Sequence, residues 1–198
     1  MRCMRQNQAL VRRYLRVIRK AAYFYNDQLR NKVITYDYMT KSGSVGQLSI
    51  TFGTKNFMHL CGVVDYKDRG PTAFFKDVLK GRVNFNRVFI RNDHYFKLKM
   101  GSLKKIEDLL NKDVIGIVED NVIFSGIDFG KMVRSKKGVL GLGTVWSEQS
   151  KDTRPLSLIN MNDTNNDEQR KLATFQPILR IRSKPMPTLQ QQKQQNTS

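Results

Sequence analysis

The apolar residues of this chain follow a helical spacing near the N-terminus and strand-like alternation further along. From residue 9 to 29 they recur at steps of three and four, the spacing of a helix with one apolar face. Arg12, Arg16, Arg19 and Lys20 fall on the other face. The pattern predicts an amphipathic helix that packs on a core. Its basic face either solvates its charges or contacts phosphate, and a helix lying on a membrane surface is a third interpretation.

Two neighbouring segments then alternate like the strands of a hairpin. Residues 33–39 are rich in β-branched and aromatic side chains, and residues 47–52 alternate apolar with polar positions. The turn residues at 41–44 predict that the two strands pair in an antiparallel hairpin. Tyr36 and Tyr38 share one face of the first strand. They either pack in the core or its rim, or offer a surface on which bases stack.

The middle of the chain mixes short helices with strands. We predict a helix at 71–80, a strand at 83–90, a strand at 95–100 and a helix at 103–111. Pro71 fits the first turn of the first helix, and Ser102 is the expected N-cap of the second. Lys97 and Lys99 would share one face of the intervening strand.

The second half is rich in strands. They are predicted at 114–118, 122–124, 129–134, 139–146 and 172–181, the first two as a hairpin. Pro177 cannot donate to a ladder, so the last strand is expected at an edge or with a bulge. The fold class is therefore α+β: an N-terminal amphipathic helix followed by a mainly antiparallel β-sheet with short helices.

Composition divides the chain into one domain and two tails. Residues 1–8 are polar and basic and are expected to be flexible, and residues 9–182 form the single folded domain. Residues 162–169 are polar and are typical of a mobile loop. From residue 183 to 198 the chain is rich in Pro, Gln and Lys, which predicts a disordered basic tail.

The charge points to a polyanionic partner. The chain has 35 Lys and Arg against 17 Asp and Glu, a formal net charge of +18. Nucleic acid is the first candidate and an anionic membrane surface the second. No signal sequence or transmembrane segment is apparent, which makes a cytoplasmic protein the expectation.

His59 is the titratable group best placed for chemistry near neutral pH. It follows a turn at a strand end, in the run Phe57-Met58-His59-Leu60, and the chain has two histidines in all. Two histidines and two cysteines at distant positions do not suit a zinc site, and the scattered acids do not suit a two-metal site. Neither a metal nor another cofactor is expected. RNA cleavage needs neither, because RNA carries its own nucleophile, the 2′-hydroxyl. A structural histidine is the alternative interpretation.

Several short motifs resemble a family of phage-associated nuclease-like domains. They are Tyr36-x-Tyr38, ITFGTKNFMHLCGV around His59, Phe74-Phe75, Lys97-Leu98 and RPLSLIN around Ser157. In this order they resemble the BECR group, which joins barnase, EndoU, colicin E5/D and RelE, and most closely its fourth phage-BECR type. The resemblance implies an α+β domain that acts as a metal-independent ribonuclease.

The resemblance also implies roles for individual residues. His59 would be the general base or acid, Lys97 would stabilise charge on the phosphate, and Ser157 would orient the phosphate or donate to it. Tyr36 would stack on a base or bond to substrate at the cleft, with Tyr38 beside it. Arg134 and Arg180 are further substrate-binding candidates, chosen near predicted strand ends, and Lys55 is one in the turn before His59.

Three hypotheses follow from the sequence. The first is a metal-independent RNA endonuclease of phage, toxin or defence origin. The second is an accessory protein that binds nucleic acid without cutting it, and the third is a toxin or interaction module that an acidic, antitoxin-like protein neutralises. RNA is the partner expected first, and the oligomeric state is left open.

Overall fold

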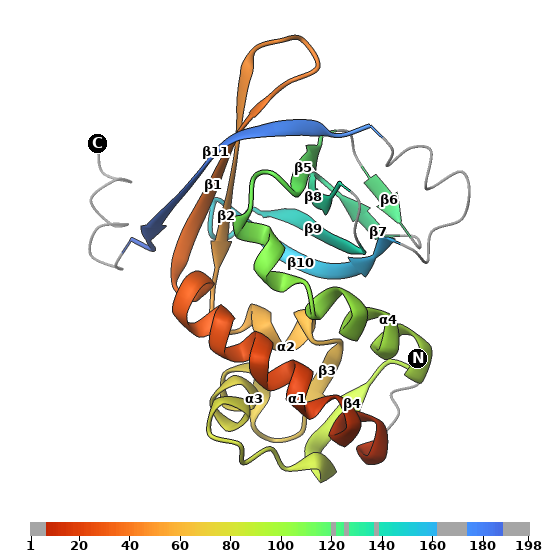
Figure 1. The fold of residues 1–198 in the computed structure, drawn as a ribbon. Coiled ribbons are helices and arrows are strands. Elements are labelled where there is room, and N and C mark those ends of the chain that lie inside the picture. The colour runs from red at the N-terminus through yellow and green to blue at the C-terminus, as the bar shows by residue number, and fades with distance from the viewer. Residues whose placement is uncertain (1–6, 120–121, 125–126, 137–138, 162–173, 188–198) are drawn as a thin grey trace.

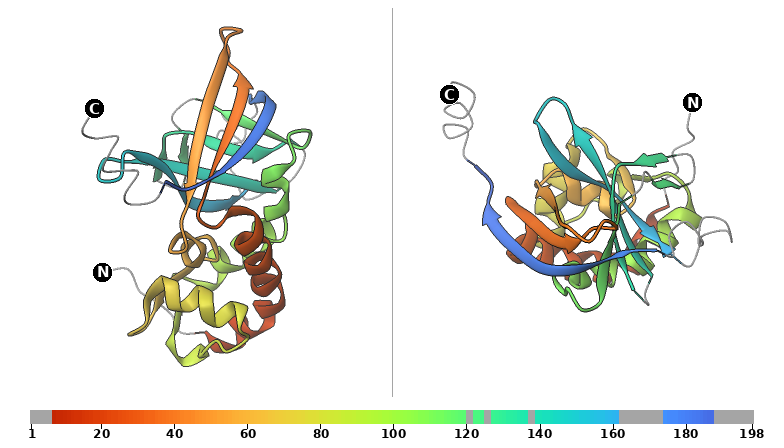
Figure 2. Two further views of the ribbon diagram at one scale, coloured as in Figure 1. Left: turned by 90° about the vertical axis from the view of Figure 1, so that its left-hand side faces the viewer. Right: turned by 90° about the horizontal axis from the view of Figure 1, so that it is seen from above.

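The computed structural model describes residues 7–119, 122–124, 127–136, 139–161 and 174–187, which adopt an α+β fold. Helices gather at one end of the molecule and a strongly curved sheet forms the other (Figures 1 and 2). The predicted fold class is therefore confirmed. The two ends meet where α2 (Asn56–Leu60) and α4 (Asp93–Leu103) pack against β10 (Asp152–Asn160).

The predicted N-terminal helix is present as α1 (Gln8–Phe24), which continues as a π-helical turn at Tyr25–Leu29. The Asn7 side chain caps it by accepting a hydrogen bond from a backbone N–H of the first turn at 3.0 Å. The apolar stripe is buried and the basic face is exposed. At the end of the stripe the buried Tyr25 hydroxyl donates to the carbonyl of Gly53 at 2.8 Å, which ties the helix to the segment before α2.

The large sheet closes on itself as a barrel with the strand order β1-β11-β5-β8-β9-β10-β2. Neighbouring strands are antiparallel, except that β2 and β10 meet in parallel at the pair Ile50 and Thr153. Besides β10, the strands are β1 (Lys32–Met39), β2 (Val45–Phe52), β5 (Ile115–Val118), β8 (Met132–Ser135), β9 (Leu140–Ser147) and β11 (Gln176–Pro185).

The predicted hairpin is confirmed by β1 and β2, in which Tyr36 lies opposite Leu48. Alternation gives these strands two different faces. One face, with Tyr36 and Leu48, is buried in the core. On the other face the hydroxyls of Thr35 and Ser49 bond to each other at 2.8 Å.

Short elements make up the helical end. They are α2, β3 (Val63–Tyr66), α3 (Gly70–Leu79), a 3-10 turn at Phe85–Arg87, β4 (Val88–Ile90), α4 and a 3-10 turn at Ile106–Leu110. β3 pairs with β4, and β6 (Val122–Phe124) pairs with β7 (Ile127–Phe129). The predicted hairpin of 114–118 with 122–124 is therefore wrong, because β5 pairs with β11 and β8 instead.

The predicted strand at 95–100 is also wrong, since these residues belong to α4. The Asn92 side chain caps this helix by accepting from the backbone N–H of Tyr95 at 2.8 Å. Phe96 and Met100, four residues apart, are buried on one side. The sequence YFKLKM fits a strand as well as a helix, because both patterns place Phe96 on the buried side and Lys97 on the exposed side.

Ser102 lies inside α4 and is not an N-cap. It is fully buried, and its hydroxyl donates to the carbonyl of Ile159 in β10 at 2.8 Å. This bond joins α4 to the barrel. The helix expected at 103–111 is reduced to the 3-10 turn, and of the strand expected at 83–90 only Val88–Ile90 forms a strand.

The last strand runs further than predicted. The sequence predicts a tail from residue 183 onward, but Ser183, Lys184 and Pro185 pair with Ile34, Val33 and Lys32. The predicted irregularity is present as a register shift where Asp37 and Tyr38 face Arg180 and Ile178. Pro177 faces Gly116 of β5, so β11 lies between two strands rather than at an edge. The predicted polar loop at 162–169 and the rest of the tail, 188–198, lie outside the described residues.

Candidate active site

His59 faces outward from a short helix whose other side is core. In α2 the neighbouring residues Phe57, Met58 and Leu60 are buried, whereas His59 is exposed. The Asn56 side chain fixes the preceding turn by accepting from the backbone N–H of Gly53 at 2.8 Å. Partial burial of the imidazole, and then the charge of Lys99, lower the pKa of His59 below its ordinary value of 6.5. Its neutral form is therefore favoured near pH 7.

Lys99 enters the same region from α4. Its Nζ donates to the Ser157 hydroxyl oxygen at 2.6 Å and makes a longer contact, 3.5 Å, with the backbone carbonyl of His59. Burial lowers the pKa of Lys99 from 10.5 to about 8, and the nearby charge of Arg91 also lowers it, while Cys61 has the opposite effect. Lys99 therefore carries a proton at neutral pH but can release it near its pKa.

Gly62 leaves room for the stem of Lys99. A Cβ on this residue would lie 2.8 Å from Cδ of Lys99, and its φ of +73° is a backbone conformation that side chains disfavour. Gly62 directly follows the turn that ends α2. Glycine is therefore needed here so that Lys99 of α4 can approach α2, which carries His59.

Ser157 is set by an irregularity in β10. Pro155 faces Thr144 and Ser157 faces Gly143, so Leu156 is an extra residue between two consecutive pairs. Leu156 points to solvent, 37% exposed, while Ser157 is half-buried. Besides accepting from Lys99, the Ser157 hydroxyl donates a long bond to the carbonyl of Leu158 at 3.3 Å. A substrate oxygen can replace that weak acceptor.

Lys99 therefore links two of the predicted residues, because it contacts the Ser157 hydroxyl and the backbone carbonyl of His59, whereas Lys97 does not enter this cluster. Lys97 is exposed on α4. The resemblance implied Lys97 through the motif Lys97-Leu98, and the predicted strand put both lysines on one face. In the helix, residues two apart lie about 200° apart, so only Lys99 reaches Ser157. The four-residue spacing of Phe96 and Met100 was the signal for a helix.

Tyr36 and Tyr38 are buried and offer no face to a base. Tyr36 is 0% exposed, and its hydroxyl has no protein partner among the described residues. Tyr38 is 1% exposed; it donates to Glu119 at 3.0 Å and accepts from Lys131 at 2.8 Å. The predicted stacking surface is corrected to core packing, because the face of β1 that carries both rings points into the barrel.

The remaining predicted substrate-binding residues lie at different places. Lys55 is exposed at the start of α2, one helical turn before His59, so it borders the site. Arg134, on β8, packs its guanidinium 5.3 Å from the centre of the Phe175 ring. Arg180, on β11, lies 3.8 Å from Asp37, whose carboxylate binds Arg182 with two bonds of 3.0 and 2.6 Å. The structure does not bring Arg134 and Arg180 to the His59 cluster.

The cluster of His59, Lys99 and Ser157 defines a class of site. It combines a neutral imidazole, a cation and a hydroxyl, the groups that proton transfer and stabilisation of an anionic phosphate require. Within the described ranges no three His, Cys, Asp or Glu residues lie close enough to hold a metal ion. No helix in this part of the chain is both long and apolar enough to cross a membrane.

Comparison with protein families identifies the group to which this fold and site belong. Residues 17–192 match the model of the phage-Barnase-EndoU-ColicinE5/D-RelE like nuclease 4 family, and the chain is a member of that family. The resemblance seen in the motifs is thereby confirmed, including the fourth type. No curated protein and no solved structure matched the chain. A nuclease acts on nucleic acid, so the family also identifies the kind of substrate.

Proposed function

We propose that this member of a nuclease family is a metal-independent RNA endonuclease that uses the 2′-hydroxyl of its substrate as nucleophile. The observation that carries the proposal is the 2.6 Å contact of Lys99 with Ser157 beside the exposed His59. The cluster offers a base, a cation and a hydroxyl, but no carboxylate to hold Mg²⁺. RNA is favoured over DNA because its 2′-hydroxyl can serve as the nucleophile, with His59 as the base.

In the proposed reaction His59 accepts the proton of the 2′-hydroxyl. The 2′-oxygen forms a bond to phosphorus, and the bond from phosphorus to the 5′-oxygen breaks. Lys99 stabilises the extra negative charge and delivers a proton to the leaving 5′-oxygen, while the Ser157 hydroxyl donates to a non-bridging oxygen. The products are a 2′,3′-cyclic phosphate and a 5′-hydroxyl.

The protonation states support this division of labour. A base must be neutral before the reaction and an acid must carry its proton. The pKa of His59 is lowered below 6.5 and that of Lys99 to about 8, so each group is in the required state near pH 7. The pKa of Lys99, about 8, also lies close enough to neutrality for efficient proton transfer.

The test is cleavage of mixed RNA in the presence of EDTA by the parent protein, His59→Ala and His94→Ala. His94 is the other histidine of the chain, and it is also exposed, which makes it the matched control. We expect the parent and His94→Ala to produce fragments ending in a 2′,3′-cyclic phosphate and His59→Ala to lose about 10²–10⁴-fold in rate. Equal rates for parent and His59→Ala would refute the mechanism.

The proposal extends to the biological setting. A cytoplasmic ribonuclease of phage, toxin or defence origin must be kept from the RNA of its own cell. A protein of net charge +18 is suited to neutralisation by an acidic, antitoxin-like partner. Affinity purification from the native cell checks this idea: recovery of no acidic protein at low salt would count against it.

A further inference from the structure

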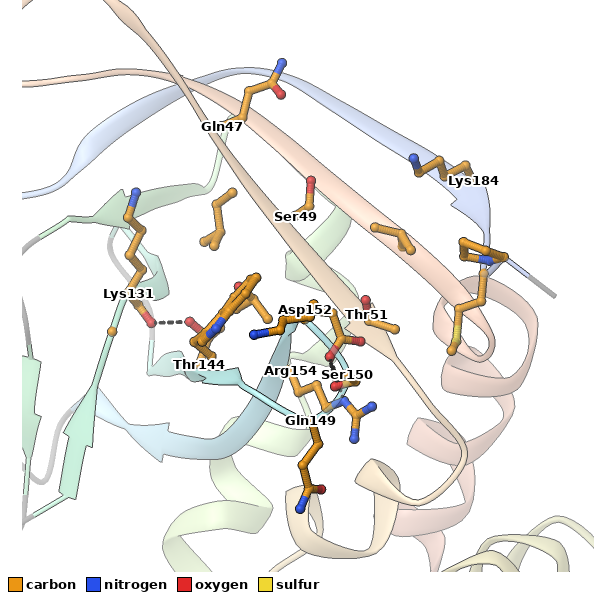
Figure 3. A pocket seen from close by; sticks show the side chains of 18 residues that line it. Gln47, Ser49, Thr51, Lys131, Thr144, Gln149, Ser150, Asp152, Arg154 and Lys184 are labelled. Carbon is orange, nitrogen blue, oxygen red and sulfur yellow. Dashed lines mark hydrogen bonds and ion pairs between the residues drawn. The ribbon is translucent and has the colours of Figure 1, made fainter. Parts of the chain in front are cut away.

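We propose that an open groove on the barrel binds a single-stranded segment of RNA beside the cleaved bond, an inference that rests on the proposed ribonuclease function. The groove lies between β2 and the hairpin of β9 and β10, and the end of β11 closes one side (Figure 3). We call it the β2–β9 groove. Its lining includes Ser49, Thr51, Trp146, Lys151, Arg154 and Lys184.

The barrel geometry opens this groove. β2 and β10 are hydrogen-bonded in parallel at the pair Ile50 and Thr153 alone, whereas β9 and β10 pair along their whole length. β2 is therefore held to the β9–β10 hairpin at a single pair of residues. The space between β2 and the hairpin has a volume of about 1100 Å³. This is larger than most small-molecule sites, and charged and polar side chains line it beside apolar ones such as Leu48, Trp146 and Met186.

Charge complementarity identifies the class of occupant. Four cationic side chains line the groove, Lys131, Lys151, Arg154 and Lys184, against one acid, Asp152. Lys151 forms an exposed ion pair with Glu148, and Arg154 forms one with the half-buried Asp152. Such pairs at the surface are weak, so a phosphate chain can compete with their carboxylates. A polyanion is thus the fitting ligand, in keeping with the net charge of +18.

Trp146 distinguishes a single strand from a duplex. It is the one tryptophan of the chain, and it is 52% exposed on β9. A large ring left open to solvent beside cationic groups is what unstacked bases use as a platform. Bases in a duplex already stack on each other and cannot use it. Hydroxyl and amide groups such as Gln47, Ser49 and Thr51 line the opposite wall, from β2, where they can bond to sugars and base edges.

The groove leads toward the candidate active site. β10 contributes Arg154 to the groove and, three residues later, Ser157 to the site, roughly 10 Å further along the strand. β2 contributes Thr51 and is followed directly by the turn and α2, which carries His59. A strand held in the groove can therefore extend into the cluster of His59, Lys99 and Ser157, where its phosphodiester reacts.

The experiment measures binding without cleavage. The probe is a single-stranded 2′-O-methyl RNA of about 12 nucleotides, a length within the range of known single-strand sites. It has no free 2′-hydroxyl, so the proposed reaction cannot cut it. Because Trp146 is the chain's single tryptophan, the intrinsic fluorescence of the protein reports directly on the groove, and anisotropy of a labelled probe reports binding independently.

Two substitutions and two matched controls test the groove. Trp146→Ala is compared with Tyr23→Ala, which removes another exposed aromatic side chain, 45% exposed, from α1. Lys184→Gln is compared with Lys80→Gln, an exposed lysine at the end of α3. We expect binding to quench Trp146 and Trp146→Ala to weaken binding roughly tenfold, with Trp146→Phe restoring most of it. Lys184→Gln should weaken binding a few-fold and lower the salt dependence by about 0.7 in log–log slope.

Three results would overturn the proposal. These are an unchanged tryptophan emission when anisotropy shows the probe bound, equal affinity of Trp146→Ala and Tyr23→Ala, and tighter binding of a duplex than of the single strand. The cleavage assay separates this proposal from the previous one. If Trp146 governs probe binding but RNA is not cut, the groove stands and the nuclease mechanism fails. If RNA is cut but binding ignores Trp146, the reverse holds.

Discussion

The His59 site and the β2–β9 groove use the same side chain, lysine, in opposite ways. Lys99 is half-buried where α4 meets β10, and this partial burial lowers its pKa to about 8. Lys151 and Lys184 are exposed at the rim of the groove. Burial turns an ammonium group into a proton donor near neutrality, whereas exposure leaves it a screened charge that attracts phosphate. The surroundings of a lysine, rather than its residue type, therefore determine whether it takes part in proton transfer or only attracts phosphate.

Lys99→Met tests this contrast with the largest expected effect. Removing the cation should lower the cleavage rate by about 10²–10³-fold, since it takes away a group aimed at the developing charge. The same change should stabilise the fold at pH 7, because the drop in pKa from 10.5 to about 8 means that the buried charge costs about 3 kcal/mol. We expect part of that gain, since the bond to Ser157 is lost as well. Kinetics and urea unfolding measure the two effects.

The pH dependence of stability checks that interpretation. Between about pH 8 and 10.5 the unfolded chain holds the proton of Lys99 while the folded protein has released it. The contribution of Lys99 to the free energy of unfolding therefore rises with pH across this window. The advantage of Lys99→Met over the parent should accordingly shrink. A constant difference from pH 7 to 10 would show that Lys99 is not buried as a cation.

Gly62→Ala sharpens the comparison by disturbing the position of Lys99. The new Cβ would meet Cδ of Lys99 at 2.8 Å, at a φ of +73°. We expect a loss of about 1–3 kcal/mol in unfolding free energy and roughly a tenfold lower cleavage rate. Gly43→Ala is the matched control, because its φ is +82° but open space surrounds it. Gly43→Ala should incur backbone strain as Gly62→Ala does, but it should keep the cleavage activity. Equal activity of both variants would show that the position of Lys99 does not matter.

The pH profile of cleavage gives a smaller effect. Activity should rise as His59 loses its proton, below pH 6.5, and fall as Lys99 loses its own near pH 8. Lys99→Arg keeps a positive charge at high pH, so the alkaline fall should move up by at least one pH unit even if the maximum rate is lower. A profile of Lys99→Arg that falls at the same pH as the parent would assign the alkaline limb to another group.

Much of the fold could be predicted because its periodicities are local. The helix of residues 9–29 and the β1–β2 hairpin each follow from spacing within one short segment. The strand prediction for residues 95–100 is wrong because YFKLKM is short enough to fit both the helical and the strand period. Asn92, the cap that decides between them, lies outside that window. Which strands pair is harder to predict, because β1 and β11 are neighbours in the barrel although they lie far apart in the sequence.

The candidate site shows the same limit. His59 and Ser157 could be chosen from motifs, but Lys99 could be chosen only once α4 was known to be a helix. Burial decided the rest: Tyr36 and Tyr38 share a face, as predicted, but that face points into the core. Which side of a strand is inside depends on what packs against it, and this information is spread over the chain. Nor could the sequence show that Trp146, far from His59, stands over an open groove.

Lys151→Gln gives the smallest expected effect and tests the groove side of the comparison. Lys151 is exposed and lies at the turn between β9 and β10, so it can act on substrate only through its field. We expect KM for RNA to rise about two- to threefold at low salt, kcat to stay unchanged, and the difference to vanish near 0.5 M salt, where screening is short-ranged. Lys80→Gln should leave KM unaltered. A change in kcat for Lys151→Gln would mean that this lysine reaches the reacting phosphate, and the division between a chemical and a binding lysine would then fail.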